Sequence, residues 1–108
     1  MDYEVILLPR AGRDIEEFVD FIGLVKNEPQ SAKRWFDELS GRIDSLSNQP
    51  ERFALIPESS RFEFGVRQIL HHSHRVLYAV DEERRRVVVL RIWHGNRKRL
   101  RPSDLTDQ

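Results

Sequence analysis

Residues 66–93 read VRQILHHSHRVLYAVDEERRRVVVLRIW, and this stretch decides the fold class. It contains three runs rich in Val, Ile, Leu and Tyr, the composition typical of β-strands. The three runs span 66–71, 75–80 and 87–93. The charged segment Asp81–Arg86 predicts the turn between the last two runs, and Ser73–His74 predicts the tight turn between the first two. The stretch therefore predicts an antiparallel meander of three strands.

The last of these strands is apolar on both of its faces. Simple alternation divides it into Val88, Leu90, Ile92 and His94 on one face and Val87, Val89, Arg91 and Trp93 on the other. Since both sets are largely apolar, we expect a central strand that is covered on both sides. Pairing Val80 with Val87 would place Arg75 opposite Ile92, with His94 and Arg97 just beyond.

The chain before residue 65 has a different period. Apolar residues recur at spacings of three and four over 11–25 and 30–48, which is typical of two amphipathic helices. Residues 3–8 predict a short strand that ends at Pro9, and residues 49–64 predict a loop. The order β-α-α-β-β-β predicts an α+β fold, with an antiparallel helical hairpin packed on one face of a small antiparallel sheet.

Composition limits the class of protein. The 108 residues predict one domain over 1–108, and the absence of cysteine excludes a disulfide scaffold, a thiolate zinc site and a cysteine nucleophile. The longest apolar runs have four residues, far fewer than the ~20 that span a membrane. We expect a cytoplasmic protein without a membrane partner, because the first residues also lack the apolar core of a signal peptide.

The net charge of zero conceals an asymmetry. Residues 1–64 hold 8 Lys and Arg against 13 Asp and Glu, and residues 65–108 hold 10 against 5, so the two parts carry −5 and +5. A basic half in a neutral chain favours a face that binds a polyanion or an acidic partner. A charged surface that only meets solvent is the alternative.

Three residues near the ends of the last two predicted strands could form one site. Arg75 begins one strand, while His94 and Arg97 follow the next, so antiparallel pairing predicts that all three meet at one edge of the sheet, with Arg67 nearby. Arginines with a histidine could bind a phosphate and catalyse attack of a 2′-hydroxyl on it. The alternative is a histidine that satisfies a backbone group beside solvated arginines.

Two further clusters of polar residues occur in the second half. Lys98, Arg99 and Arg101 extend the cationic run and would suit phosphate or an acidic protein, unless they are simply solvated. His71, His72 and His74 suggest a metal, but alternation would point His71 and His72 to opposite faces, and no acidic ligand is near in sequence. We therefore expect no metal site and no cofactor.

The order and spacing of several short segments over residues 3–98 resemble the RelE/ParE toxin superfamily of type II toxin–antitoxin modules. The segments are Tyr3-Glu4-Val5, Pro9-Arg10-Ala11, Asp14-Ile15-Glu16-Glu17-Phe18, Val66-Arg67-Gln68, His74-Arg75-Val76-Leu77-Tyr78, Val87–Ile92 and His94-Gly95-Asn96-Arg97. The resemblance implies a helical hairpin on a small antiparallel sheet. It also implies growth inhibition that a cognate antitoxin neutralises in a hetero-oligomer of toxin and antitoxin.

The superfamily has two kinds of activity, and the resemblance leaves both open. Some members cleave mRNA on the ribosome, and Arg75 and Arg97 match their phosphate-binding arginines, with His94 available for acid–base chemistry. Other members poison DNA gyrase, and the long helical hairpin is similar to theirs. The residues that precede Arg75 lack the lysines frequent in the ribonucleases. A non-toxic relative that only binds protein or nucleic acid is the alternative from another class.

Overall fold

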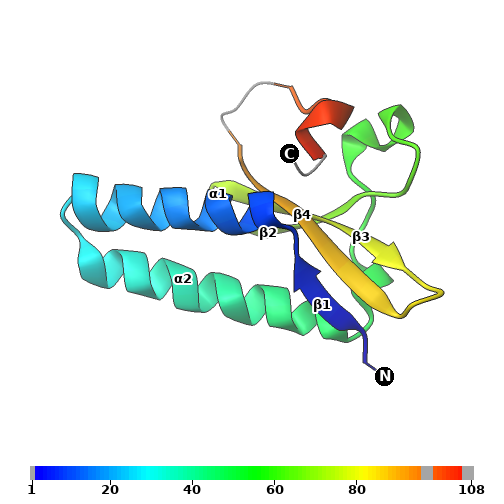
Figure 1. The fold of residues 1–108 in the computed structure, drawn as a ribbon, viewed down its shortest axis with the longest axis horizontal. Coiled ribbons are helices and arrows are strands. Elements are labelled where there is room, and N and C mark those ends of the chain that lie inside the picture. Colours follow the sequence, from blue (N-terminus) through cyan, green and yellow to red (C-terminus); the bar gives the residue numbers. More distant parts are fainter. Residues whose placement is uncertain (1, 96–98, 106–108) are drawn as a thin grey trace.

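The computed structural model describes residues 2–95 and 99–105, and it has the predicted α+β architecture (Figure 1). Its main elements are β1 (Glu4–Leu7), α1 (Pro9–Asp20), α2 (Pro29–Asp44), β2 (Arg67–His71), β3 (His74–Asp81) and β4 (Arg86–His94). A π-helical segment, Phe21–Val25, extends α1 toward the turn of the hairpin. Short 3₁₀ helices lie at Ser45–Ser47, Pro50–Arg52, Pro57–Arg61 and Pro102–Leu105. The predicted order β-α-α-β-β-β is confirmed.

The four strands form one mixed sheet in the order β1-β4-β3-β2. The meander of β2, β3 and β4 is antiparallel, as predicted, but β1 runs parallel to β4. The prediction of a purely antiparallel sheet is therefore wrong for this strand. A parallel pair needs a long crossover connection, and here everything between Leu7 and Arg86 supplies it.

A β-bulge changes the register between β3 and β4. Val80 pairs with Val87 as predicted, but the register shifts between Leu77 and Tyr78, and Leu90 is the extra residue. Beyond the bulge Arg75 lies opposite Trp93 rather than Ile92. A bulge puts two residues of one strand against one of its partner and reverses the alternation that follows. The predicted division of 87–94 into two faces is therefore wrong after Leu90.

The corrected faces carry two hydrophobic clusters, one on each side of the sheet. The cluster beneath the helices contains Ala11, Ile15, Trp35, Leu39, Ile43, Leu46, Ile69, Val76, Tyr78, Val87, Val89 and Ile92. The cluster on the other face contains Ile56, Val66, Leu77, Leu90, Trp93, Leu100 and Leu105. In Figure 1 the short helices of 57–61 and 102–105 lie on the side of the sheet away from α1 and α2. The prediction that β4 is covered on both sides is confirmed.

Several predicted boundaries differ from those in the structure. Helix α1 begins at Pro9, because proline fits the first turn of a helix, where its missing N–H is not needed. Helix α2 ends at Asp44 and is followed by a 3₁₀ turn. The tight turn between β2 and β3 is His72–Ser73, and His74 already belongs to β3. Within the described ranges, no helix is both long and apolar enough to cross a bilayer.

Candidate functional site

Arg75 is held on the sheet face that points away from the helices. Its guanidinium donates two hydrogen bonds to the carboxylate of Glu58, at 3.0 and 2.8 Å, and a third to Gln68 at 2.6 Å. The hydrogen bond from Arg75 lowers the pKa of the Glu58 carboxyl. A bidentate ion pair that is about four-fifths buried fixes both side chains, so Arg75 serves to anchor the 57–61 segment on the sheet.

His94 lies on the opposite face, beneath the helical hairpin. It pairs with His74 across β3 and β4, and the two rings meet edge to face with centroids 4.7 Å apart. Since neighbouring residues on a strand point to opposite faces, Arg75 points away from both histidines. The predicted meeting of Arg75 with His94 is therefore wrong. Arg97, the third member of the predicted cluster, lies outside the described residues.

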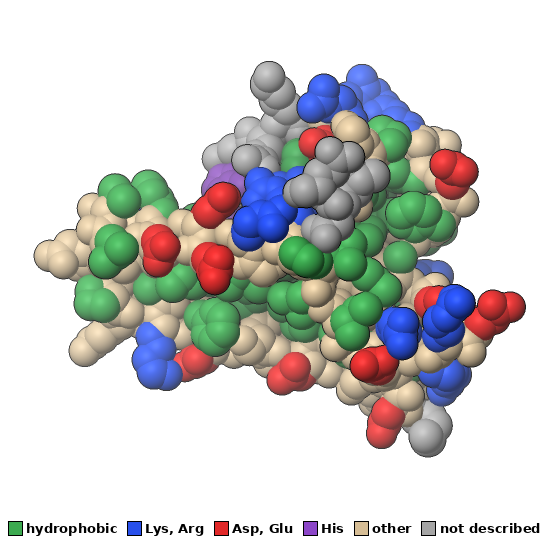
Figure 2. Space-filling model, in the orientation of Figure 1, with side chains coloured by type: hydrophobic (Ala, Val, Ile, Leu, Met, Phe, Trp, Pro, Cys, Tyr) green, Lys and Arg blue, Asp and Glu red, His purple; other side chains and the backbone are tan. Residues whose placement is uncertain are grey.

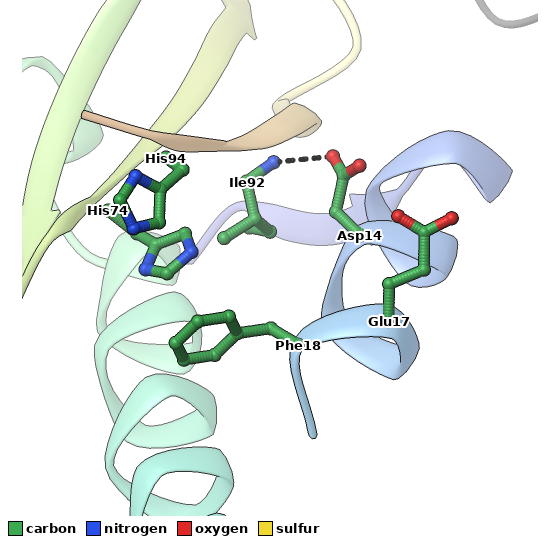
Figure 3. A pocket seen from close by; sticks show the side chains of 6 residues that line it. All are labelled: Asp14, Glu17, Phe18, His74, Ile92 and His94. Carbon is green, nitrogen blue, oxygen red and sulfur yellow. Dashed lines mark hydrogen bonds between the residues drawn. The ribbon is translucent and has the colours of Figure 1, made fainter. Parts of the chain in front are cut away.

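The two histidines line a small pocket between β4 and α1 (Figure 3). Its other lining residues are Asp14, Glu17, Phe18 and Ile92. Figure 3 shows the imidazoles facing the Phe18 ring, with the two carboxylates on the α1 side. The pocket has a volume of about 160 Å³, below the ~300–1,000 Å³ of most ligand sites. It can admit a side chain or a few solvent molecules rather than a whole nucleotide.

His74 is a neutral, buried member of this pocket. Burial, and then the nearby charge of His94, lower the pKa of His74 to about 4. Its ring packs against Phe18 and Trp35, with centroid distances of 4.3 and 5.4 Å. Its Nδ1 has no hydrogen-bond partner among the described residues. A histidine of this kind is not an imidazolium near pH 7 and has no acidic proton to transfer, so it fits a packing role better than that of a general acid.

A buried ion pair forms the floor of the site. The Asp14 carboxylate accepts hydrogen bonds from Arg91 at 2.7 and 3.1 Å and from the backbone N–H of Ile92 at 3.0 Å. Arg10 adds a contact of 3.2 Å from Nη1 to the same carboxylate, and it also lies 3.7 Å from Glu17. The arginine charges at this end of the sheet are therefore balanced by carboxylates rather than turned toward a ligand.

The other predicted binding residues that the structure describes, Arg67, Arg99 and Arg101, are not among those that line the pocket. Arg67 donates to the carbonyl oxygens of Glu51 and Phe53, so it holds the loop that precedes β2. Arg99 is exposed, and Arg101 is exposed beside Asp104, with 3.7 Å between its Nε and the carboxylate. Lys98 lies outside the described residues. A phosphate-binding role for the basic tail thus remains a prediction.

The charge asymmetry of the sequence is largely cancelled by the fold. Three arginines of the basic half pair with carboxylates of the acidic half: Arg75 with Glu58, Arg86 with Glu4, and Arg91 with Asp14. Two more, Arg84 and Arg85, pair with Asp81 and Glu82 in their own turn. Among the described residues, these pairs engage five of the basic half's arginines with carboxylates, which weakens the expectation of a polyanion-binding surface on the sheet.

Sequence reasoning missed two functional groups of this region. Asp14 shares the helical stripe of Ala11, Ile15 and Phe18, and a charged residue at a core position of an amphipathic helix is a signal that could have found it. The sequence predicts a turn at His74, and a turn residue gives no indication that its side chain lies in the pocket. The bulge at Leu90 is what sets His74 opposite His94.

Comparison with known proteins agrees with the fold. The family described as the ParE toxin of type II toxin–antitoxin systems matches residues 5–99. A chain of the RelBE2 toxin–antitoxin complex of Mycobacterium tuberculosis is similar at 23% identity and TM-score 0.58, covering 87% of this chain and 99% of that one. A chain of the archaeal RelE–RelB complex of Pyrococcus horikoshii is similar at 19% identity and TM-score 0.56. The match covers 90% of this chain and 99% of that one.

No curated protein matches the chain in sequence. At their low identities the two solved structures show likeness of fold, whereas the family match extends over most of the chain. The same span contains the helical hairpin, the mixed sheet and the pocket. The chain therefore belongs to the ParE toxin family of type II toxin–antitoxin systems.

Proposed function

We propose that this protein is the toxin of a type II toxin–antitoxin module and that it inhibits growth through a non-enzymatic contact with DNA gyrase. The observation that carries the choice between gyrase and mRNA is the position of Arg75. Its guanidinium is neutralised by Glu58 on the sheet face opposite His94. Arg75 and His94 therefore cannot contact the same phosphate group.

Cleavage of RNA by 2′-hydroxyl attack needs cations directed at the charge that develops on the phosphate. Arg10 and Arg91, the two arginines that contact the pocket residue Asp14, are both paired with its carboxylate. Among the described residues that line the pocket, two are carboxylates and none is an arginine or lysine that could stabilise the charge on a phosphate. The pocket is thus poorly suited to phosphoryl transfer, and this supports an inhibitory contact with protein.

The turn of the helical hairpin supplies a surface for such a contact. Leu24 and Val25 are 77% and 73% exposed, and Phe21 is also exposed beside them. Figure 2 shows hydrophobic side chains gathered at this end of the molecule. Exposed apolar clusters of this kind are typical of protein interaction sites. We assign the gyrase contact to this hairpin tip, defined as residues Phe21–Val25.

Neutralisation by a cognate antitoxin is part of the same proposal. Both similar solved structures are toxin–antitoxin complexes. We expect the antitoxin to be encoded beside this gene and to form a hetero-oligomer with the toxin. If opposite charges guide the encounter, the association rate should fall as the ionic strength rises. A rate that is indifferent to salt would indicate an apolar contact.

The test is a growth assay with three variants expressed with and without the neighbouring gene. Leu24→Glu should abolish toxicity, because losing a central apolar anchor costs about 2 kcal/mol or more, roughly a thirtyfold loss of affinity. Leu70→Glu is the matched control, since Leu70 is an exposed leucine of β2, outside the hairpin tip. His94→Ala should remain toxic. DNA breaks and mRNA integrity are scored in the same cells.

Each alternative predicts a different result in this assay. DNA breaks with intact mRNA support gyrase as the target. Cleaved mRNA together with a non-toxic His94→Ala would overturn the proposal and favour catalysis in the pocket, for which the pairing of His74 with His94 is the supporting observation. Unimpaired growth with the folded wild-type chain would favour a relative that only binds its partners.

A further inference from the structure

A second group of potential ligands contains Glu38, His71 and His72, none of which lines the pocket of His74 and His94. Glu38 comes from α2, His71 from the end of β2 and His72 from the turn that follows. Their potential ligand atoms all lie within 4.8 Å of one another. The Nε2 of His72 is 3.0 Å from the Glu38 carboxylate, and the two imidazole rings are 4.6 Å apart at their centroids.

Strand alternation and the lack of an acidic residue nearby in sequence argue against a metal site here. Neither objection holds in the folded chain. His72 does not continue the strand: its φ of 55° places it in the left-handed region of a two-residue hairpin turn. Its side chain therefore does not follow the alternating directions of the strand, and its ring lies against the ring of His71. The acidic ligand comes from a position 34 residues away, so proximity in sequence could not reveal it.

The hydrogen bonding of His71 prepares it as a ligand. Its Nε2 lies 3.2 Å from the backbone carbonyl oxygen of Trp35. Because a carbonyl oxygen only accepts, that nitrogen carries the proton, and the lone pair of the neutral ring is on Nδ1. Histidines that bind metals commonly donate their other N–H to a carbonyl or carboxylate in this way. His71 is 3% exposed, so its ring is fixed by packing as well.

We propose that Glu38, His71 and His72 form a binding site for a divalent transition-metal ion, Zn²⁺ being the best fit. Two imidazoles and one carboxylate are a ligand set that zinc accepts, with water completing a tetrahedral arrangement. Glu38 and His72 are exposed and can rotate to shorten the spacing between ligand atoms to that of a bound ion. The nearby positive charges of Arg34 and Arg42 make the site weaker than a four-ligand structural site.

A bound ion would add a second link between α2 and the β2–β3 hairpin, beside the buried hydrogen bond of His71 with Trp35. An ion that binds only the folded chain raises the free energy of unfolding by an amount that grows with the logarithm of its concentration over its Kd. The inference is independent of the toxic activity, because it is read out by binding and melting. It concerns a surface separate from both the pocket and the hairpin tip.

The test is calorimetric titration of the full chain, without a purification tag, with ZnCl₂ and in parallel with MgCl₂. We expect one Zn²⁺ per chain, a rise in melting temperature with Zn²⁺, and neither effect with Mg²⁺. His72→Asn and Glu38→Gln should each weaken binding by more than ~100-fold, since even outer partners of metal ligands contribute 10–100-fold. Asparagine tolerates the left-handed backbone at residue 72, so this variant keeps the turn.

Two further variants make the result decisive. Glu16→Gln is the matched control for Glu38→Gln, because Glu16 is an exposed glutamate of α1, and it should bind Zn²⁺ like the wild type. His94→Asn tests the other histidine pair. Loss of binding in His94→Asn, equal binding in His72→Asn and the wild type, or no binding by the wild type would each overturn the proposal.

Discussion

Replacing Asp14 with alanine is expected to lower the free energy of unfolding by about 3–5 kcal/mol, a large share of the ~5–15 kcal/mol typical of a domain. The side chains of Asp14 and Arg91 are only 5% and 6% exposed. Without the carboxylate, the guanidinium of Arg91 loses two hydrogen bonds and stays buried with its charge unpaired. The N–H of Ile92 also loses its acceptor. The loss of stability therefore comes from the buried guanidinium of Arg91 and the N–H of Ile92, which no longer have the Asp14 carboxylate as a partner.

Urea denaturation of the wild type and the variant measures this change. Glu16→Ala is the control, since it removes an exposed carboxylate of the same helix and should stay within about 0.5 kcal/mol of the wild type. Replacing both partners, as Asp14→Leu with Arg91→Met, should recover much of the loss, because an apolar pair often substitutes for a buried ion pair. A single variant as stable as the wild type would contradict this account.

Acidification is expected to destabilise the protein by up to about 3 kcal/mol through His74 alone. The pKa of this imidazole is about 4 in the folded protein, because it is buried, and 6.5 without that burial. Between these values the unfolded chain binds a proton that the folded protein does not. The contribution of His74 to stability is therefore complete above pH 6.5 and is lost as the pH falls toward 4.

The measurement is the unfolding free energy of the wild type and of His74→Phe at several values between pH 7.5 and 4. Phenylalanine keeps a ring against Phe18 and Trp35 but cannot bind a proton. The wild type should lose more stability than the variant over this range, and the difference isolates His74 from the carboxylates. Parallel curves for the wild type and His74→Phe would refute the prediction.

The elements were predictable because they depend on local patterns. A period near 3.6 over 11–25 and 30–48 indicated the helices, and alternating or continuous apolar runs after residue 65 indicated the strands. Val80 pairs with Val87 because the charged residues between them favour a short turn. The partner of β1 was not predictable, since no local feature of residues 4–7 distinguishes a parallel from an antiparallel neighbour.

The candidate site was harder to predict because one extra residue reverses every side chain beyond it. Without the bulge at Leu90, His94 would not lie opposite His74. The sequence correctly selected His94 as a residue of interest, but it placed Arg75 beside it. The actual partner of Arg75 is Glu58, a residue of the connecting segment that a strand argument does not consider.

The amino-acid sequence by itself determined the α+β class, the helical hairpin, the meander and the family, because periodicity and the order of elements are properties of neighbouring residues. The tertiary structure alone decided which charges cancel and which histidines meet. Arg75 lies 17 residues from Glu58, and His72 lies 34 from Glu38. Such pairs depend on the register of the sheet and on the packing of α2 against it, and both arise from contacts between elements that are distant in the chain.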